Sequence, residues 1–493
     1  MNHTALSIKE SFSEKTVFVV GGSGFIGKVW LSMMLDLAPG FKKIYVLVRA
    51  SRGKSAKTRF AEMFASSPVF THLHHKYGTN VLDIKKLGIL EGNVSIPKFG
   101  LSDSDYNNLI NDVDVTLNFA ADLRFNAPLD EMLKANSEGP LNVAELILAS
   151  KKSKLLHIST CYVAGMSDGI VEESLSKLIS PSGISFSAEE EFNWAKQEGL
   201  AARSRDATNT ELTNIGILRA KRLGWPNTYT YTKALGEILL SQKIPKDRLS
   251  IFRPSIVESS EKYPFPGWNE DFNGTAPFVQ LLSSRYRVLV AKPQNKLDVI
   301  PVDYVARGLS IAASALLRGT HADIYQSSTS SINPLTVETA SSFIVKYYKK
   351  AERKRLDGFL LPYPKPKFVS PKHVLSGQNI KKMEKSVSYV FDKISLEKNS
   401  AKFINQTGLK HVIRFIKQKA RIVDTIAQVY RPFIYDYNYT FKCDNLMAHN
   451  VIEEEFSYTP SNIEWDKYWH EIHLPGLKRW CMPQIKSLTG EKK

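Results

Sequence analysis

The sequence predicts an α/β protein whose first part is a doubly wound parallel sheet. Between Thr16 and Phe252, short β-branched or aromatic runs typical of buried strands alternate with helical patterns, and a glycine-rich loop separates the first strand from the first helix. The chain has 493 residues, which exceeds one ordinary domain. We therefore expect two domains, residues 1–360 with the sheet and residues 361–493 as a mainly helical C-terminal domain.

The first elements form a strand–helix–strand unit. The run Thr16–Val20 predicts a strand that ends at the loop Gly21–Gly27, and an amphipathic helix then continues to Leu37. Pro39-Gly40 ends this helix, and Lys43–Val48 is the expected second strand. Further strands are expected at Asp114–Phe119, Leu155–Ser159 and Leu249–Phe252.

Two later stretches interrupt the alternation. Residues 174–223 are polar, and Ala188–Arg205 has a helical pattern, which we interpret as an insertion over the site. A lysine-containing segment is punctuated by four prolines, so we expect the domain boundary there: Pro362, Pro364, Pro366 and Pro371. The C-terminal part contains one long helical pattern, Lys402–Val429, followed by the aromatic stretch Tyr430–Phe441.

Composition excludes several classes of protein. The polar N-terminus, with Glu10 and Glu14, lacks the apolar core of a signal peptide, and no run of about 18 apolar residues predicts a membrane-spanning helix. The three cysteines show neither a disulfide framework nor metal-ligand spacing. We therefore expect a cytoplasmic protein, soluble or peripheral to a membrane, that binds no metal.

The glycine loop predicts a dinucleotide site. Gly21, Gly24 and Gly27 lie between a strand and a helix, where backbone N–H groups and the positive helix end can face a pyrophosphate. This is the arrangement of Rossmann-like folds, although the spacing differs from the usual GxGxxG. The bare pattern is also compatible with glycines in a tight turn, and the flanking strand and helix favour the cofactor site.

The residues after the second strand favour NADPH over NADH. An NAD enzyme usually presents a carboxylate there to the ribose 2′-hydroxyl. Here Val48 is followed by Arg49, then Arg52 and Lys54, and the first acid is Glu62. Arginine guanidinium groups suit a 2′-phosphate. The alternative is a solvated basic turn.

Tyr229 and Lys233 predict a proton donor. The apolar pattern that follows Pro226 is helical, so these two side chains should lie one turn apart on one face, whereas Tyr231 points elsewhere. An ammonium group beside a phenol favours the phenolate and lowers the pKa of the tyrosine towards the range of a general acid.

Ser159 and Thr160 place two hydroxyls at the carboxyl end of an expected core strand. Ligands bind at such strand ends in open parallel sheets, and either hydroxyl can stabilise a developing oxyanion. Cys161 beside them suggests a rival role as a nucleophilic thiolate, but no base is arranged near it in the sequence. We expect Cys161 to be a small core residue.

The formal charge of +17, from 66 basic and 49 acidic residues, calls for an anionic partner. No nucleic-acid module signature appears, so we do not expect nucleic-acid binding. The segment from Lys398 to Val423 has no acidic residue and combines a basic with an apolar side. Such a helix can lie at an anionic membrane surface, and the alternative is an ordinary packed helix with a solvated face.

Several motifs together resemble a known family. The glycine loop, Asn118-Phe-Ala-Ala121, Arg124-Phe125, Ser159-Thr160, Tyr229 to Lys233 and Arg253 to Val257 resemble the extended short-chain dehydrogenase/reductases. Within this group, four further motifs resemble the fatty acyl-CoA reductases with a male-sterility-type C-terminal domain: Trp225 to Lys233, Pro266-Gly267-Trp268, Pro301-Val302-Asp303 and Asn462 to Asp466. Two departures are Val20, where a threonine is usual, and Asn93, where an aspartate is common.

The resemblance implies reduction of a long-chain acyl-CoA by NADPH, as far as the alcohol used in wax esters. It implies that Tyr229 is the acid, that Lys233 tunes it and holds the nicotinamide ribose, and that Thr160 positions the carbonyl. It also implies a set of cofactor-binding residues: Gly21, Ser23, Gly24, Phe25, Ile26, Gly27, Arg49, Arg52, Asn93, Ala120 and Lys233.

Two alternative functions stay open from the sequence. One is a thioester reductase that stops at the aldehyde or uses carrier-bound acyl groups. The other is a non-catalytic NADP-binding lipid sensor.

Overall fold

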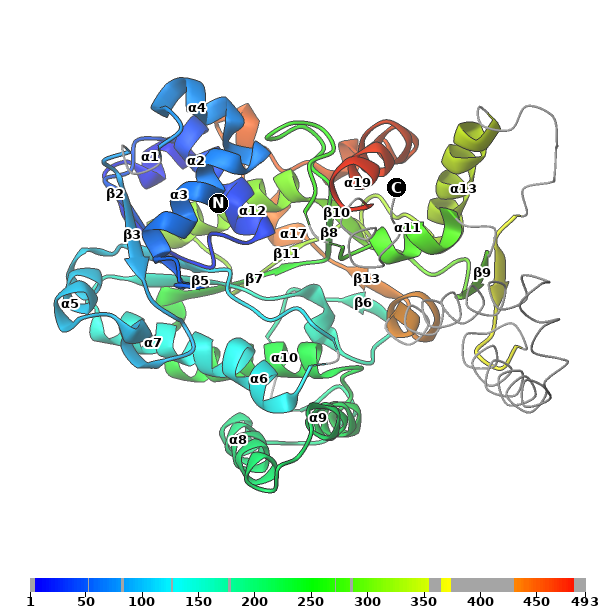
Figure 1. Ribbon diagram of the computed structural model, residues 1–493, viewed down its shortest axis with the longest axis horizontal. Helices are drawn as coiled ribbons and strands as arrows, with labels where there is room; N and C mark the ends of the chain where they lie inside the picture. Colours follow the sequence, from blue (N-terminus) through cyan, green and yellow to red (C-terminus); the bar gives the residue numbers. More distant parts are fainter. Residues whose placement is uncertain are drawn as a thin grey trace, which may run out of the picture.

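A computed structural model describes residues 5–51, 53–80, 84–125, 127–175, 179–270, 272–283, 287–353, 365–373 and 430–482. Its centre is a seven-stranded, all-parallel sheet with the order β11-β7-β5-β4-β1-β2-β3 (Figure 1). Its strands, in chain order, are β1 Thr16–Val20, β2 Lys43–Val48, β3 Leu87–Glu91, β4 Val115–Asn118, β5 Lys154–Ile158, β7 Leu249–Pro254 and β11 Ile324–Ser327.

Among the described residues, three two-stranded parallel pairs complete the strands: β6 Gly169–Val171 with β13 Tyr439–Phe441, β8 Ile256–Glu258 with β10 Val299–Pro301, and β9 Val288–Val290 with β12 Lys367–Val369. The α-helices are α1 Ile8–Phe12, α2 Phe25–Leu37, α3 Ala56–Ser66, α4 Thr71–Tyr77, α5 Asp103–Asp112, α6 Leu129–Leu133, α7 Gly139–Ala149, α8 Ala188–Ser204, α9 Asn209–Leu223, α10 Thr228–Lys243, α11 Ala276–Ser283, α12 Val302–Arg318, α13 Val337–Arg353, α17 Asp444–Met447, α18 Trp465–Lys467 and α19 Leu474–Trp480.

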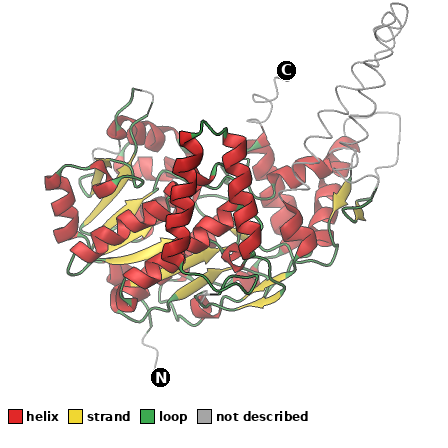
Figure 2. Cartoon of the chain, turned by 90° about the horizontal axis from the view of Figure 1, so that it is seen from below, coloured by secondary structure: helices red, strands yellow, loops and turns green. Residues whose placement is uncertain are grey.

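Helices cover both faces of the sheet, because its strands are apolar on both sides. In β1, Val17 and Val19 face one core, which α2 and α12 complete. Phe18 and Val20 face the other core, against α5, α7 and α10. Figure 2, the view from below, shows helices in front of the strands. The predicted doubly wound, Rossmann-like parallel sheet is therefore confirmed.

The predicted insertion is helical, but it does not lie over the site. The pair α8 and α9 packs against α6 and α10, below the sheet in Figure 1. Among the described residues between 174 and 223, none lines the cavity described below. The expected position was wrong because the apolar stripe of α8 and α9 is buried around Tyr231, on the side of α10 that faces away from the cavity.

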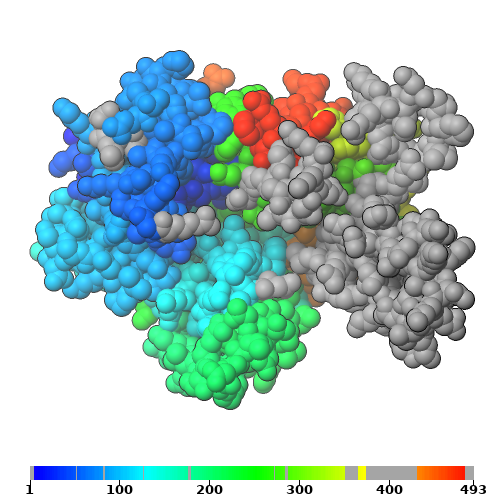
Figure 3. All heavy atoms as spheres, in the orientation of Figure 1, coloured from blue at the N-terminus to red at the C-terminus, as the bar shows by residue number. Residues whose placement is uncertain are grey.

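The described C-terminal residues 430–482 pack into the same core as the sheet. Strand β13 pairs with β6, and Glu453 accepts hydrogen bonds from the backbone N–H of Ile8 and from the Ser7 hydroxyl. In Figure 3 the red C-terminal atoms lie against green residues from the middle of the chain. The proposed division near residue 360 falls outside the described residues and stays a prediction, as does the basic helix Lys402–Val429.

Candidate active site

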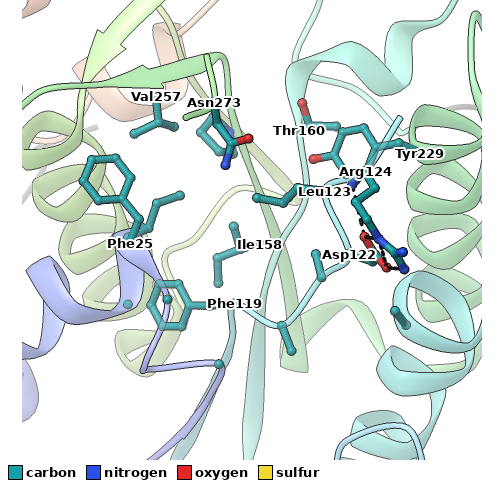
Figure 4. A pocket seen from close by; sticks show the side chains of 18 of the residues that line it. Phe25, Phe119, Asp122, Leu123, Arg124, Ile158, Thr160, Tyr229, Val257 and Asn273 are labelled. Atoms are coloured by element: carbon teal, nitrogen blue, oxygen red, sulfur yellow. Dashed lines mark hydrogen bonds and ion pairs between the residues drawn. The ribbon is translucent and has the colours of Figure 1, made fainter. Parts of the chain in front are cut away.

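A cavity of about 1100 Å³ opens at the carboxyl ends of β1, β4 and β5. The chain leaves β1 towards β2 on one side and reaches β4 on the other, so the strand order reverses between β1 and β4. Ligands bind at this reversal point in open parallel sheets. Figure 4 shows Thr160 and Tyr229 on one wall, with Phe25 and Val257 on the other.

The glycine loop forms one end of the cavity, and close approaches require glycine at Gly21 and Gly27. Gly21 has a φ of +81°, and a Cβ there would lie 2.7 Å from the Ala120 nitrogen. A Cβ on Gly27 would lie 2.8 Å from the Gly21 carbonyl oxygen. Helix α2 begins directly after Gly24, which provides no side-chain cap. The first turn therefore presents backbone N–H groups to the cavity, as a pyrophosphate requires.

All the cofactor-loop residues predicted from the sequence line the cavity: Gly21, Ser23, Gly24, Phe25, Ile26 and Gly27. Lys233 and Ala120 line it as well, and the Ala120 N–H donates to the Asn118 Oδ1. Asn93 also lines it, and its Oδ1 accepts from the Ser95 backbone at 3.1 Å, so the side chain shapes its own turn.

Two arginines lie near the end of β2. Arg49 lines the cavity, while Arg52 lies outside the described residues. Arg59 of α3 also lines the cavity, and its guanidinium donates to the Arg49 carbonyl. Sequence reasoning missed Arg59 because it lies on the next helix. Glu62 is paired with Lys54 at 2.6 Å and does not line the cavity.

Thr160 and Tyr229 are brought together across the cavity wall. Thr160 follows β5, and its side chain lies beside Tyr229 at the cavity (Figure 4), where its hydroxyl also accepts from the Tyr162 N–H at 3.3 Å. Helix α10 positions Tyr229 because the Asn227 side chain caps the helix by accepting from the Thr230 N–H at 2.9 Å. The helix therefore begins at Thr228, directly after Asn227.

The pKa of Tyr229 is raised, which differs from the expectation that Lys233 lowers it. Burial raises the pKa, and the Thr160 hydroxyl opposes this effect. The Lys233 Nζ donates instead to the Ile158 carbonyl at 2.7 Å. Burial also lowers the pKa of Lys233 to about 8. In the absence of ligand, Tyr229 therefore keeps its proton, which suits a donor.

Two neighbouring residues lie outside the cavity wall. Tyr231 points to the opposite side of α10, where its hydroxyl donates to the Glu191 carboxylate, as the helix spacing predicts. Cys161 is fully buried, and its thiol donates to the Arg253 carbonyl at 3.0 Å. Burial raises the pKa of this thiol well above its usual range. These features support the interpretation of Cys161 as a core residue.

The end of the cavity opposite the glycine loop is aromatic. The Phe125 ring packs edge-on against Tyr229 with ring centroids 5.6 Å apart. Phe433 contacts Phe125 at 5.9 Å and Tyr162 at 4.7 Å. Tyr430, from the same C-terminal segment, donates to the Gly274 carbonyl. The sequence showed an aromatic stretch there, but nothing in it indicated that the stretch returns to the site.

Comparison with known proteins decides the family. An NAD-binding family model described as "Male sterility protein" matches residues 19–309. The chain is 30% identical to "Probable fatty acyl-CoA reductase 4" of Arabidopsis thaliana, covering 94% of this chain and 97% of the relative. The chain belongs to the fatty acyl-CoA reductases of the male sterility family.

Other fatty acyl-CoA reductases match at similar length. The "Alcohol-forming fatty acyl-CoA reductase" of Simmondsia chinensis is 27% identical, covering 96% of this chain and 98% of the relative. Among solved structures, the terminal R domain from the myxalamid PKS-NRPS pathway superposes with a TM-score of 0.60 at 14% identity, covering 97% of this chain and 91% of that one. This last likeness supports the fold alone.

Membership among the fatty acyl-CoA reductases makes this protein an oxidoreductase with a nicotinamide cofactor, which the glycine loop fits. In the part of the chain that the structure describes, no helix has the length and apolar character to cross a membrane. Within the same residues, no group of three metal-ligating side chains occurs.

Proposed function

We propose that the protein reduces long-chain fatty acyl-CoA to the fatty alcohol with NADPH, through an aldehyde, and releases CoA. The observation that carries this proposal is the Thr160–Tyr229 pair between the glycine loop and the aromatic end of one cavity. The dinucleotide fits the loop end. The acyl chain then extends along Phe125 and Phe433, because apolar surface favours it there.

The chemistry needs a proton donor and an oxyanion site at the carbonyl. When bound, the reduced nicotinamide supplies the hydride for both reductions. Thr160 and Tyr229 donate hydrogen bonds to the thioester carbonyl oxygen, and Tyr229 transfers its proton to that oxygen as charge develops. The resulting hemithioacetal breaks its C–S bond and releases CoA as the thiol.

The aldehyde then occupies the same position. Tyr229 first regains a proton from solvent. Thr160 and Tyr229 then bind the aldehyde oxygen in the same way, and Tyr229 gives up this second proton to form the alcohol. Each turnover therefore consumes two hydrides and two protons per acyl group. The Lys233 side chain would bind the nicotinamide ribose, because Lys233 lines the cavity one turn along α10 from Tyr229.

We propose NADPH because of Arg49 and Arg59. Both line the cavity near the end of β2, and guanidinium groups suit a phosphate. Glu62, the first acid after β2, is held by Lys54 on the surface. Among the described residues between the end of β2 and Arg59, there is no Asp or Glu that could accept a hydrogen bond from the ribose 2′-hydroxyl.

The ratio of NADPH oxidised to CoA released tests the function. Purified protein with hexadecanoyl-CoA should oxidise two NADPH for each free thiol and form hexadecanol. One NADPH per thiol, with aldehyde accumulating, would instead indicate an aldehyde-forming thioester reductase. NADPH binding without oxidation would indicate a lipid sensor.

We further propose peripheral contact with anionic membranes through the segment from Lys398 to Val423, which combines basic and apolar residues. Acyl-CoA substrates partition to such surfaces. Flotation with anionic liposomes at low salt tests this contact, and protein that stays at the bottom of the gradient contradicts it.

A further inference from the structure

Three buried polar side chains form a chain behind the cavity wall. Asn118 ends β4, His157 lies on β5 and Lys233 lies on α10. The Asn118 Nδ2 is 3.3 Å from His157 Nδ1, and His157 Nε2 is 3.4 Å from Lys233 Nζ. Each of the three residues is at most 1% exposed. Asn118 and His157 are fully enclosed, and Lys233 is buried apart from the side that lines the cavity, so the hydrogen-bonding roles between the three must be mutually compatible.

The orientation of the Asn118 amide fixes the first role. Its Oδ1 accepts the Ala120 backbone N–H at 3.1 Å, so its NH₂ group faces the imidazole. An NH₂ group is a donor, and His157 Nδ1 must accept from it. In a neutral imidazole, one nitrogen accepts and the other carries the proton. The proton of His157 therefore lies on Nε2, opposite Lys233.

The position of this proton determines which form of Lys233 fits. An ammonium group has three donors and no acceptor, so it would place a donor against the His157 Nε2–H. A neutral amine can accept that N–H with its lone pair. It also donates to the Ile158 carbonyl at 2.7 Å, which leaves one N–H for the cavity.

We propose that His157 is a positioning residue for Lys233, whose neutral amine it holds through its Nε2–H, and that Asn118 fixes this arrangement by binding Ala120. The inference deepens the proposed function and rests on it, because it assigns a regulator to the lysine beside Tyr229. Protonating Lys233 would require the other His157 tautomer, and Asn118 would then have to turn its amide and release Ala120 beside the glycine loop.

The surrounding charges agree with this arrangement. Burial lowers the pKa of His157 well below its usual range, so the imidazole is neutral. Burial lowers the pKa of Lys233 to about 8, and Glu237 opposes that effect. The Glu237 carboxylate is itself bound by Arg253 of β7, at 2.6 Å and 3.0 Å.

The first experiment observes the tautomer directly and does not depend on activity. The ¹⁵N chemical shifts of histidine-labelled, cofactor-free protein at pH 9 distinguish protonated from unprotonated ring nitrogens, and the signals missing in His157→Phe belong to His157. The proposal expects protonated Nε2 and unprotonated Nδ1. Protonated Nδ1 would overturn it, whether or not the protein reduces acyl-CoA.

The second experiment measures kcat/KM for NADPH-dependent reduction against pH. The ammonium form of Lys233 favours the phenolate that Tyr229 becomes, so loss of that ammonium sets the alkaline limb. Removing the His157 donor in His157→Phe should move this limb up by about half to one pH unit. Thr116→Val is the matched control on β4. The buried Thr116 hydroxyl makes no hydrogen bond to Asn118, His157 or Lys233, so this variant should keep the wild-type alkaline limb. An unmoved limb in an active His157→Phe protein overturns the proposal.

Discussion

The Thr160 hydroxyl lies beside the Tyr229 phenol at the wall of the cavity, and it opposes the rise in the pKa of Tyr229 that burial causes. Thr160 comes from the end of β5 and Tyr229 from the first turn of α10, so the fold brings together two donors that are far apart in the sequence. A carbonyl oxygen that replaces this mutual contact would receive both hydrogen bonds.

Thr160 and Ser159 should differ in their effect on the reaction. Both hydroxyls line the cavity, but the Ser159 Oγ has no hydrogen-bond partner among the described residues, whereas Thr160 contacts Tyr229. Thr160→Ala should lower kcat about 100- to 1000-fold, as for loss of an oxyanion donor. Ser159→Ala should change it only a few-fold. Steady-state kinetics with one acyl-CoA checks both, and the reverse order would assign the role to Ser159.

Arg59 should select NADPH. Arg59→Ala should raise the KM for NADPH about ten- to hundred-fold, because a charge-assisted contact to the 2′-phosphate is lost, and should leave the KM for NADH unchanged. Lys54→Ala is the matched control, since Lys54 is also basic but is paired with Glu62 outside the cavity. An equal rise for both cofactors would show that Arg59 acts on the fold and not on the phosphate.

Phe433 should limit the acyl chain. Its ring closes the aromatic end beside Phe125 and Tyr162, so Phe433→Ala should shift the kcat/KM ratio of long to medium chains about tenfold towards the longer ones. Competition between two acyl-CoAs measures this ratio. Ile434→Ala, a buried neighbour that does not line the cavity, controls for local destabilisation. An unchanged ratio in both variants would show that the acyl chain does not lie against Phe433.

Glu258 should make stability depend on pH. Burial raises the pKa of this carboxyl to about 8, whereas the unfolded chain loses the proton near 4.5. The folded state therefore binds the extra proton between these values, and the free energy of unfolding falls as pH rises through them. His473 is buried beside Glu258 and has a pKa of about 3. It is present both in the wild type and in a Glu258 variant, so its own titration cancels when the two are compared.

Thermal melts of Glu258→Gln, whose side chain cannot ionise, check this sign. The melting temperature of the variant relative to wild type should be higher at pH 8.5 than at pH 5. The exposed carboxylate variant Glu62→Gln should show no such trend. A difference that stays constant with pH would mean that Glu258 does not carry the buried proton.

Strands with buried, β-branched sequences could be predicted, and strands that depend on distant partners could not. The five expected strands are present, with ends that shift by at most two residues. Strand β3 was missed, because Gly88 weakens its β-branched pattern. The glycine is needed there because a Cβ would lie 2.7 Å from a carbon of the Tyr45 ring. Strand β11 was also missed, since Gln326 is buried by donating to Val171 and Lys442, which are remote in sequence.

The polar half of the site could be predicted, since its residues lie at strand ends and on one helix turn. The aromatic half could not, because Tyr430 and Phe433 return to the site only through the tertiary fold. The pKa of Tyr229 likewise depends on its burial and on Thr160, whereas the sequence showed only the neighbouring Lys233.

The activity of Tyr229→Phe, with NADPH binding measured on the same protein, tests whether Tyr229 is the proton donor. The variant loses only the phenolic hydroxyl, so acyl-CoA reduction should fall about 100- to 10,000-fold while the NADPH Kd stays within about twofold. Tyr231→Phe, whose hydroxyl meets Glu191 on the other side of α10, should keep its activity. A Tyr229→Phe protein that reduces acyl-CoA at the wild-type rate would show that Tyr229 is not the proton donor.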